Sequence, residues 1–383
     1  MKVLINAISI KEGGSRVVLG KLLQHMTAID DTTQWHVAAN ARLRGCKELQ
    51  LPRIVPHFFG DTELAPMYIW CWYNRTLPKL LIETGADVLF SLTNYLPSAR
   101  LSCPSLLLVQ HAGHFSQLFD ERMQATLSLP GRLTWRAKRR WVVRSLHQAS
   151  RVTVQTRALG CAIEAQTGIT VDKVTVIPHG HGLTTSVKVP CDYPGHRCWQ
   201  IGYVSKFGVQ KNFGVLIDAA ARLSVSVADF RLHLTLNPEI EACRRVIEQA
   251  EQAGIGHLVV NHGDLDAAGV RELYEELDLF VFPSSCESFG FPMLEAMSQG
   301  MPILIADTES NREITGSGGI TFDADNAKAL ADRLTILMQD KMAYEQAAAA
   351  MLSRAGNFSW QKAARETYEL LVTTIEGVRG REA

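Results

Sequence analysis

The feature that most constrains this chain is residues 279–307, LFVFPSSCESFGFPMLEAMSQGMPILIAD. Residues 279–282 are apolar and β-favouring and end at Pro283, which predicts a short buried strand followed by a polar turn. Pro292 suits the first position of a helix, and Gly300 suits the left-handed residue that follows one. Residues 303–306 are apolar again. The stretch therefore predicts a buried strand, a turn, a helix and a second buried strand.

Two carboxylates lie in this unit with seven residues between them, Glu287 in the turn and Glu295 near the start of the helix. Between them, Phe289, Gly290 and Phe291 lead into the helix N-terminus. Unpaired backbone N–H groups and the positive end of the helix dipole attract phosphate at such a position. The layout predicts a cradle for a nucleotide diphosphate with one acid on each side.

The whole string resembles the Glu-x7-Glu motif of the retaining glycosyltransferases of family 4 (group 1), which have the GT-B fold. Their pattern P-S-x-x-E-G-F-G-x-P-x-L-E-A-M-x-x-G-x-P corresponds to PSSCESFGFPMLEAMSQGMP here, with Ser288 where glycine is usual. Residues 205–212, SKFGVQKN, resemble the family's G-R-L-x-x-x-K-N, with Lys206 where arginine is usual. The resemblance extends along the chain and is strongest between residues 200 and 360.

This resemblance implies an α/β protein with two Rossmann-like αβα domains that face a cleft and a C-terminal helix that crosses back to the first domain. It implies that Glu287 holds hydroxyls of the donor sugar and that Glu295 holds the ribose hydroxyls. Lys206 and Lys211 lie in a strand-to-helix loop, where two cations can grip a diphosphate from two sides. With the helix N-terminus near Gly290, they would stabilise the leaving diphosphate without a metal ion or any other cofactor.

Two further candidate sites lie in the first half of the chain. Gly13 and Gly14 form a loop between a predicted strand at residues 2–7 and a helical pattern, and such a loop lets a ligand approach the backbone. The resemblance places this loop over the donor phosphates and the acceptor. His111 follows a predicted strand at residues 105–110, and ligands of open α/β sheets bind at this end of a strand. The family has a histidine facing the donor sugar here, whereas we expect His114 to be an ordinary loop residue.

The length of 383 residues predicts two domains, because one hydrophobic core rarely serves so long a chain. Residues 184–197 contain Pro190, Pro194 and Gly195 and lack periodicity, which is typical of a linker. We therefore expect a first, acceptor-side domain at residues 1–190, a second, nucleotide-sugar-binding domain at 191–360 and a returning helix at 361–383.

The composition excludes several classes of protein. Lys and Arg total 39 and are balanced by 39 Asp and Glu, which argues against general nucleic-acid binding. Eight cysteines are scattered without C-x-x-C or His/Cys ligand spacing, which predicts reduced thiols in the cytoplasm and no structural metal. No apolar run has the length of a membrane span, and the first residues, MKVLINAIS, resemble a strand more than a signal peptide.

A basic segment follows in the first domain, with no acidic residue between residues 122 and 162. On a helix, Arg136, Arg140 and Arg144 form one stripe. The stripe has two interpretations: peripheral attachment to anionic lipid on the inner face of the membrane, or the solvated face of a core-packed helix. The second is favoured, because basic residues spread around the helix. The aromatic segment at residues 67–81 is expected to be a helix that faces the core.

The function that the family resemblance implies is retaining transfer of a sugar from a nucleotide diphosphate to a glycan or lipid-linked acceptor in cell-envelope polysaccharide or glycolipid synthesis. Two alternatives remain. One is a phosphorylase or a synthase with a soluble acceptor on the same fold. The other is a non-catalytic relative that binds nucleotide sugars, although the presence of Lys206, Lys211, Glu287 and Glu295 together argues against it.

Overall fold

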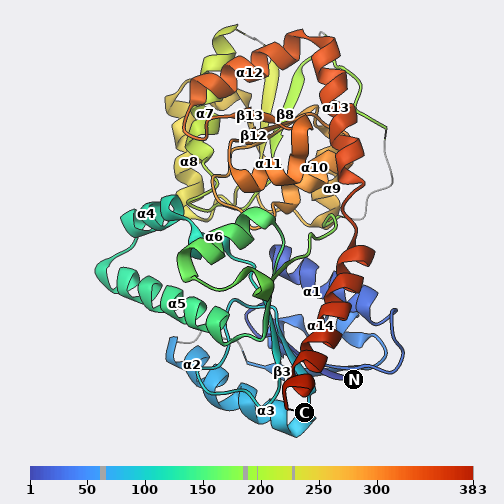
Figure 1. Ribbon diagram of the computed structural model, residues 1–383. Helices are drawn as coiled ribbons and strands as arrows, with labels where there is room; N and C mark the ends of the chain where they lie inside the picture. The colour runs from blue at the N-terminus through green and yellow to red at the C-terminus, as the bar shows by residue number, and fades with distance from the viewer. Residues whose placement is uncertain (61–65, 184–188, 196, 227–228, 383) are drawn as a thin grey trace. The chain divides into compact units, whose positions relative to one another are not determined.

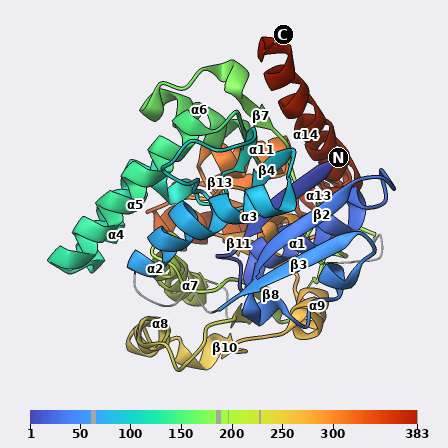
Figure 2. The same ribbon diagram turned by 90° about the horizontal axis from the view of Figure 1, so that it is seen from below.

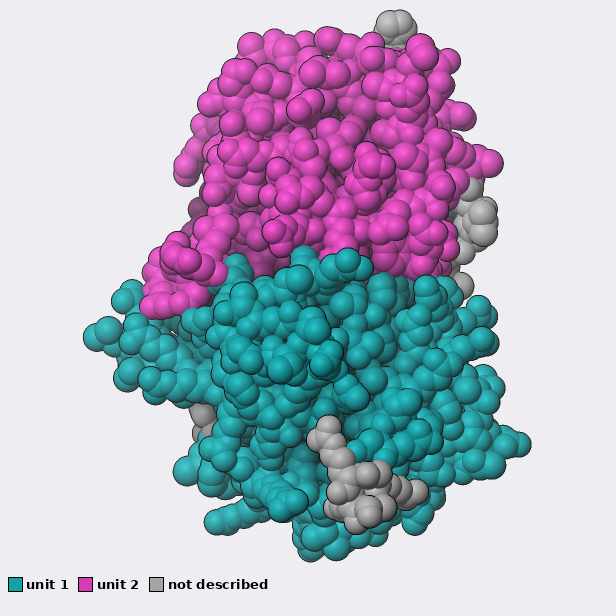
Figure 3. Space-filling view, viewed as in Figure 1, with its two compact units in different colours: residues 1–116, 126–180, 359–383 teal, residues 117–125, 181–358 magenta. Residues whose placement is uncertain are grey.

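The computed structural model describes residues 1–60, 66–183, 189–195, 197–226 and 229–382, and it divides the chain into two compact units (Figure 3). The first unit comprises Met1–Ser116, Thr126–Gly180 and Ser359–Ala383, and the second comprises Gln117–Ala125 and His181–Phe358. The chain enters the second unit at residue 181, earlier than the expected 191, and leaves it after residue 358. Residues 184–188 and 196 of the expected linker lie outside the described residues.

The core of the first unit is a seven-stranded parallel sheet (Figure 1). In spatial order its strands are β3 (Ile54–Phe59), β2 (Gln34–Asn40), β1 (Lys2–Ala7), β4 (Val88–Ser91), β5 (Ser105–Leu108), β6 (Arg151–Val154) and β7 (Val174–Val176). The two central strands β1 and β4 pair with Val3 opposite Val88. Apolar side chains on both faces of the sheet are buried, as is typical when helices cover both sides of parallel strands.

The helices of the first unit are α1 (Gly13–Met26), α2 (Pro66–Cys71), α3 (Leu77–Thr84), α5 (Leu129–Gln148), α6 (Arg157–Thr167) and α14 (Trp360–Glu382). Short helical turns cover Ala41–Leu43, Lys47–Gln50, Ala112–Phe115 and Val171–Lys173, and a π-helical turn covers Trp72–Thr76. On α1 the buried face consists of Val18, Leu19, Leu22, Leu23 and Met26. These are the residues of the helical pattern in the sequence, because apolar residues three and four apart share one helix face.

The helical segment at residues 66–84 only partly faces the core. Trp72 and Tyr73 are buried, and the ring of Tyr73 lies 5.0 Å from that of Trp141 on α5. Met67 and Trp70 on α2 are instead exposed, by 75% and 49%. The expectation of a core-facing helix is therefore right for the later turns and wrong for α2, which precedes the π-helical turn.

The second unit contains a six-stranded parallel sheet. In spatial order its strands are β10 (Val259–Asn261), β9 (Phe230–Leu234), β8 (Trp199–Tyr203), β11 (Leu279–Phe282), β12 (Ile303–Ala306) and β13 (Ile320–Phe322). Its helices are α4 (Gln117–Thr126), α7 (Phe213–Ser226), α8 (Glu241–Gln252), α9 (Ala267–Glu276), α10 (Phe291–Ser298), α11 (Glu309–Thr315), α12 (Ala327–Gln339) and α13 (Lys341–Ala355). Single helical turns cover Gly256–Leu258 and Gly316–Gly318. The strand, turn, helix and strand expected at residues 279–307 are β11, a turn, α10 and β12, so this prediction is confirmed.

The C-terminal helix α14 packs on α1 in the first unit, and Figure 2 shows it from a second direction. At its start, Trp360 stacks on His179 with the ring centres 4.9 Å apart. Further along, the hydroxyl of Tyr368 donates to Asp30 at 2.7 Å, in the loop that follows α1. The expected return of the last helix to the first domain is confirmed. None of the described helices has both the length and the apolar composition needed to cross a bilayer.

Candidate active site

The centre of the candidate site is an ion pair between the loop after β8 and the turn after β11. The ammonium of Lys211 lies 2.5 Å from the carboxylate oxygen Oε1 of Glu287, and their side chains are only 15% and 13% exposed. The hydroxyl of Ser284 donates to the same oxygen at 2.5 Å. Two residues that are 76 positions apart in the sequence are thus held together in a largely buried place.

The loop that carries Lys211 is fixed by its neighbours. The carbonyl of Gln210 accepts hydrogen bonds from the backbone N–H of Ser285 at 2.9 Å and from the hydroxyl of Ser284 at 3.3 Å. Asn212 has a φ of 53° in the left-handed region, and its side-chain amide donates to the carbonyl of Ala324 at 2.5 Å. Asparagine tolerates this conformation better than most residues. The ammonium of Lys211 is therefore positioned before any ligand binds.

One cation near this turn was not found from the sequence. Arg122 on α4 donates to the hydroxyl of Ser285 at 3.1 Å and pairs with Asp325 at 2.6 Å. It lies in the segment Gln117–Ala125, which belongs to the second unit although the sequence on both sides of it belongs to the first. The sequence carries no local signal for this contact, because it depends on where the chain places α4.

Gly290 caps the N-terminus of α10 with a φ of 86°. A Cβ atom there would lie 3.3 Å from the ring of Phe282, so glycine meets both the conformational and the steric demand. Phe289 is buried and its ring packs 5.8 Å from that of Phe358. Its side chain thus belongs to the core, which leaves its backbone as the part that can contact a donor. Phe291 is half-buried at the first position of α10.

Glu295 lies on α10 and is buried. Burial raises the pKa of its carboxyl group to about 7, and a hydrogen bond from the hydroxyl of Tyr274 partly opposes this rise. A Cβ atom at Gly182 would lie too close to the Oε1 atom of Glu295, so a larger residue there would require this carboxyl group to move. Both acids of the motif are therefore closely surrounded, and among the described residues Glu287 is the one of the two that pairs with a cation.

Lys206 is exposed on the same loop as Lys211. The structure thus separates the two predicted cations by environment: Lys211 is buried against Glu287, and Lys206 faces solvent. An exposed lysine on a loop can reorient toward a ligand, whereas a buried one is already positioned.

The predicted residues of the first half of the chain all lie in the first unit. Gly13 begins α1 with a φ of 67°, and a Cβ atom there would meet open space; Gly14 follows it in the helix. His111 is exposed after β5, and its ring lies 5.0 Å from that of His114. His114 is not an ordinary loop residue, because it is buried and stacks on Trp135 at 4.6 Å.

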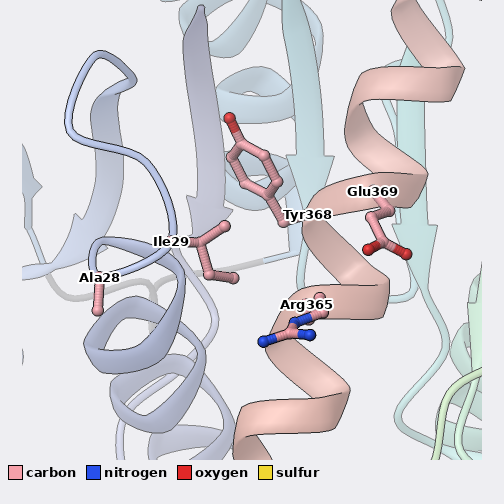
Figure 4. Close-up of a pocket in the computed structure, with 5 residues that line it drawn as sticks. All are labelled: Ala28, Ile29, Arg365, Tyr368 and Glu369. Carbon is pink, nitrogen blue, oxygen red and sulfur yellow. The ribbon is translucent and has the colours of Figure 1, made fainter.

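A separate pocket of about 540 Å³ lies between the end of α1 and α14 (Figure 4). It is lined by Ala28, Ile29, Arg365, Tyr368 and Glu369. The predicted site residues do not line it. The hydroxyl of Tyr368 donates a hydrogen bond to Asp30, so this side chain holds α14 against the loop that follows α1. Within the described parts of the chain, no three His, Cys, Asp or Glu side chains gather closely enough to hold a metal ion.

Comparison with known proteins finds a family model that matches part of the chain. Residues 196–354 match the model of the glycosyl transferases group 1. A segment of 102 residues is 36% identical to O-antigen chain mannosyltransferase B of Escherichia coli and covers 26% of this chain and 27% of that protein. A segment of 240 residues is 26% identical to the D-inositol 3-phosphate glycosyltransferase of Arthrobacter sp. (strain FB24) and covers 59% of this chain and 56% of that protein.

Solved structures share the fold over the whole chain. The structure of HepE from Anabaena, in complex with UDP and glucose, is similar with a TM-score of 0.70 at 17% identity, covering 97% of this chain and 100% of that one. WaaG, a glycosyltransferase involved in lipopolysaccharide biosynthesis, is similar with a TM-score of 0.70 at 14% identity, covering 97% of this chain and 99% of that one. At these identities the likeness establishes the fold, which is the expected GT-B architecture.

Proposed function

We propose, from the match of residues 196–354 to the group 1 glycosyl transferases, that the protein moves a sugar from a nucleotide-diphosphate donor to an acceptor hydroxyl with retention of the anomeric configuration. The observation that carries this proposal is the buried pair of Lys211 and Glu287 in front of α10. The pair combines a positioned cation with a carboxylate that accepts hydrogen bonds. A nucleotide-sugar donor needs the cation for its diphosphate and the carboxylate for the hydroxyls of its sugar.

Binding of the donor would exchange partners at this pair. The diphosphate offers Lys211 a more highly charged anion than Glu287, and Glu287 then accepts hydrogen bonds from hydroxyls of the donor sugar. Negative charge grows on the leaving diphosphate as the glycosidic bond breaks. Lys211, Lys206 and the N-terminus of α10 would stabilise that charge more strongly in the transition state than in the ground state.

Other predicted residues take complementary roles in this proposal. Glu295 accepts hydrogen bonds from the ribose hydroxyls. Gly13 and Gly14 cover the phosphates, and His111 supports the positive charge that develops at the anomeric carbon.

We further propose that the reaction is independent of metal ions, because lysines and a helix N-terminus supply the positive charge that a divalent ion supplies elsewhere. Turnover is expected to be unchanged after dialysis against EDTA. Loss of turnover that magnesium or manganese restores would contradict this part of the proposal.

The acceptor is proposed to be a glycan or a lipid-linked sugar of the cell envelope. Support comes from the partial matches, which include a mannosyltransferase of O-antigen chains and the LpsB mannosyltransferase of lipopolysaccharide core biosynthesis in Rhizobium meliloti. Arg136, Arg140 and Arg144 would then lie against the inner face of the membrane that carries such an acceptor. We propose a hexose as the transferred sugar. GDP-mannose is the first donor to test, because both of these partial matches are mannosyltransferases.

The test is a panel of UDP-, GDP- and ADP-sugars, assayed for nucleoside diphosphate release with and without acceptor mixtures, together with the anomeric configuration of the product by NMR. The proposal requires one donor to be consumed with retention. Consumption that depends on inorganic phosphate would indicate a phosphorylase, and consumption that depends on a small soluble sugar would indicate a soluble-acceptor synthase. Donor binding without consumption would indicate a non-catalytic relative.

A further inference from the structure

Tyr274 on α9 is a buried tyrosine whose hydroxyl lies against Glu295 in the second unit. The hydroxyl is 3.2 Å from the Oε2 atom of Glu295 and 3.0 Å from the backbone carbonyl of Pro292, at the start of α10. The ring is fixed by packing 5.8 Å from that of Phe280 on β11.

The hydroxyl has one proton and two acceptors within reach. Burial, followed by the nearby Glu295 carboxylate, raises the pKa of Tyr274 well above its usual value, so the hydroxyl stays protonated wherever the protein is folded. When Glu295 is ionised, the charge-assisted hydrogen bond to Oε2 is the stronger of the two choices. When Glu295 is neutral, the carbonyl of Pro292 becomes the better acceptor. The phenol therefore responds to the charge on Glu295.

We propose that Tyr274 is a positioning residue that holds Glu295 ionised and correctly oriented to accept the ribose hydroxyls of a nucleoside diphosphate. This role rests on the proposed function, because it concerns the same site. Its physical basis is that a buried carboxylate needs a donor to offset the loss of water, and among the described residues no cation is paired with Glu295. Glu287 has Lys211 for this purpose, whereas burial and Tyr274 are the influences on the pKa of Glu295. From the other side, Gly182 lies against Oε1, so the backbone limits how the carboxyl can turn.

The test is the pH profile of the affinity for free UDP and GDP, measured by calorimetry from pH 5.5 to 9. Wild-type protein should bind one of them more tightly as the pH rises through about 7. Tyr274→Phe should weaken binding by roughly tenfold at pH 7 and move the midpoint upward by about one unit, since a hydrogen bond to a charged group is lost. Glu295→Gln should remove the pH dependence.

The matched control is Tyr344→Phe. Tyr344 is also fully buried in the second unit and donates to a backbone carbonyl, that of Asp278, at 2.9 Å. Its loss removes a buried hydroxyl without touching Glu295, so the profile should stay that of the wild type. A double variant, Tyr274→Phe with Glu295→Gln, should bind no more weakly than Glu295→Gln alone, whereas a purely structural role would give additive losses.

Incorporation of 3-fluorotyrosine gives a second measurement that does not depend on the folding of Tyr274→Phe. Fluorine makes the phenol a stronger donor at nearly the same size, so the midpoint of the labelled wild type should move downward. A Tyr274→Phe profile equal to that of the wild type, or a labelled protein with an unmoved midpoint, would overturn the positioning role. Failure of the wild type to bind UDP, GDP or ADP, with no donor of the panel consumed, would instead overturn the proposed function itself.

Discussion

The pairing of Lys211 with Glu287 makes each of these residues costly to replace. Both side chains are largely buried, so removal of one leaves an uncompensated charge in a place with little water. Without Lys211, the hydroxyl of Ser284 would still donate a hydrogen bond to the same carboxylate oxygen, but it carries no charge. The pair therefore couples local stability to the chemistry of the site.

At this scale we predict that Lys211→Ala folds but loses turnover by roughly 100- to 1,000-fold at saturating donor, the effect of removing one positioned donor from a developing charge. Steady-state kinetics with circular dichroism of the variant would measure it. The control is Lys328→Ala, which removes an exposed lysine of the same unit that pairs with Asp332, and it should retain full activity. Turnover near that of the wild type in Lys211→Ala would contradict the assigned role.

At the scale of elements, the start of α14 depends on a glycine. A Cβ atom on Gly180 would lie 2.5 Å from the ring and 2.6 Å from the backbone nitrogen of Trp360. The backbone at residue 180 thus leaves no room for a side chain where α14 begins. His179, the residue before it, stacks on the same tryptophan ring.

We therefore predict that Gly180→Ala destabilises the protein by about 1–3 kcal/mol, the usual cost of overpacking. Urea unfolding followed by tryptophan fluorescence would measure the change. Gly45→Ala is the matched control, because a Cβ atom at Gly45 meets open space and should leave the free energy of unfolding nearly unchanged. An equal effect of the two substitutions would show that the contact with Trp360 is not what limits residue 180.

The helix α5 places Arg136, Arg140 and Arg144 on its exposed side. Two exposed leucines, Leu129 and Leu133, occupy its first turns. If this face binds anionic lipid, each arginine contributes roughly 1 kcal/mol near the surface. The structure thus adds an apolar end to the basic stripe, and the two interpretations of the stripe remain to be separated by experiment.

We predict that wild-type protein sediments with vesicles of phosphatidylglycerol and phosphatidylcholine in a salt-sensitive manner, and that reversal of the three arginines to glutamate abolishes this binding. Reversal of Arg244, Arg245 and Arg271, which are exposed on the second unit, makes the same change in net charge and is the control. Weak, salt-insensitive sedimentation of all three proteins would identify the stripe as a solvated surface.

At the scale of the whole molecule, buried ionisable groups make stability depend on pH. Burial lowers the pKa of His179 from 6.5 to about 3 in the folded state. Below pH 6.5 the unfolded chain therefore binds a proton at His179 that the folded chain does not bind. The contribution of His179 to the free energy of unfolding is fully present above pH 6.5 and is lost as the pH falls toward 3.

We predict that the free energy of unfolding of the wild type falls by about 2 kcal/mol between pH 6.5 and 5 through this residue. His179→Phe keeps an aromatic ring on Trp360 and should lose less stability over the same interval. Urea titrations at the two pH values would measure it, with His147→Gln, at an exposed histidine of the same unit, as the control. An unchanged pH dependence in His179→Phe would assign the acid sensitivity to other groups.

Local patterns explain how much of this molecule the sequence could predict. The strands and the helix at residues 279–307 follow from apolar runs, Pro292 and Gly300, all of which act within a few residues. The edge strand β3 contains Pro56, which is unusual inside a strand, and the edge strand β13 has only three residues, so neither has a strong local pattern.

The residues of the candidate site likewise fall into those that a local pattern predicts and those that it does not. The sequence indicated Lys211, Glu287 and Glu295 because each lies in a contiguous motif. Arg122 and Tyr274 contact this motif from helices that lie elsewhere in the sequence, and a pattern of neighbouring residues cannot show such contacts. The same is true of the segment Gln117–Ala125, whose place in the second unit depends on the path of the chain.

The place of α14 also affects how the protein is made. On a ribosome, α1 emerges long before α14, the helix that packs on it. The whole second unit is encoded between α1 and α14 and includes no residue beyond Phe358. The nascent chain can therefore complete its second unit while the first still exposes the apolar surface that α14 covers, and that surface is a target for chaperones until α14 has emerged.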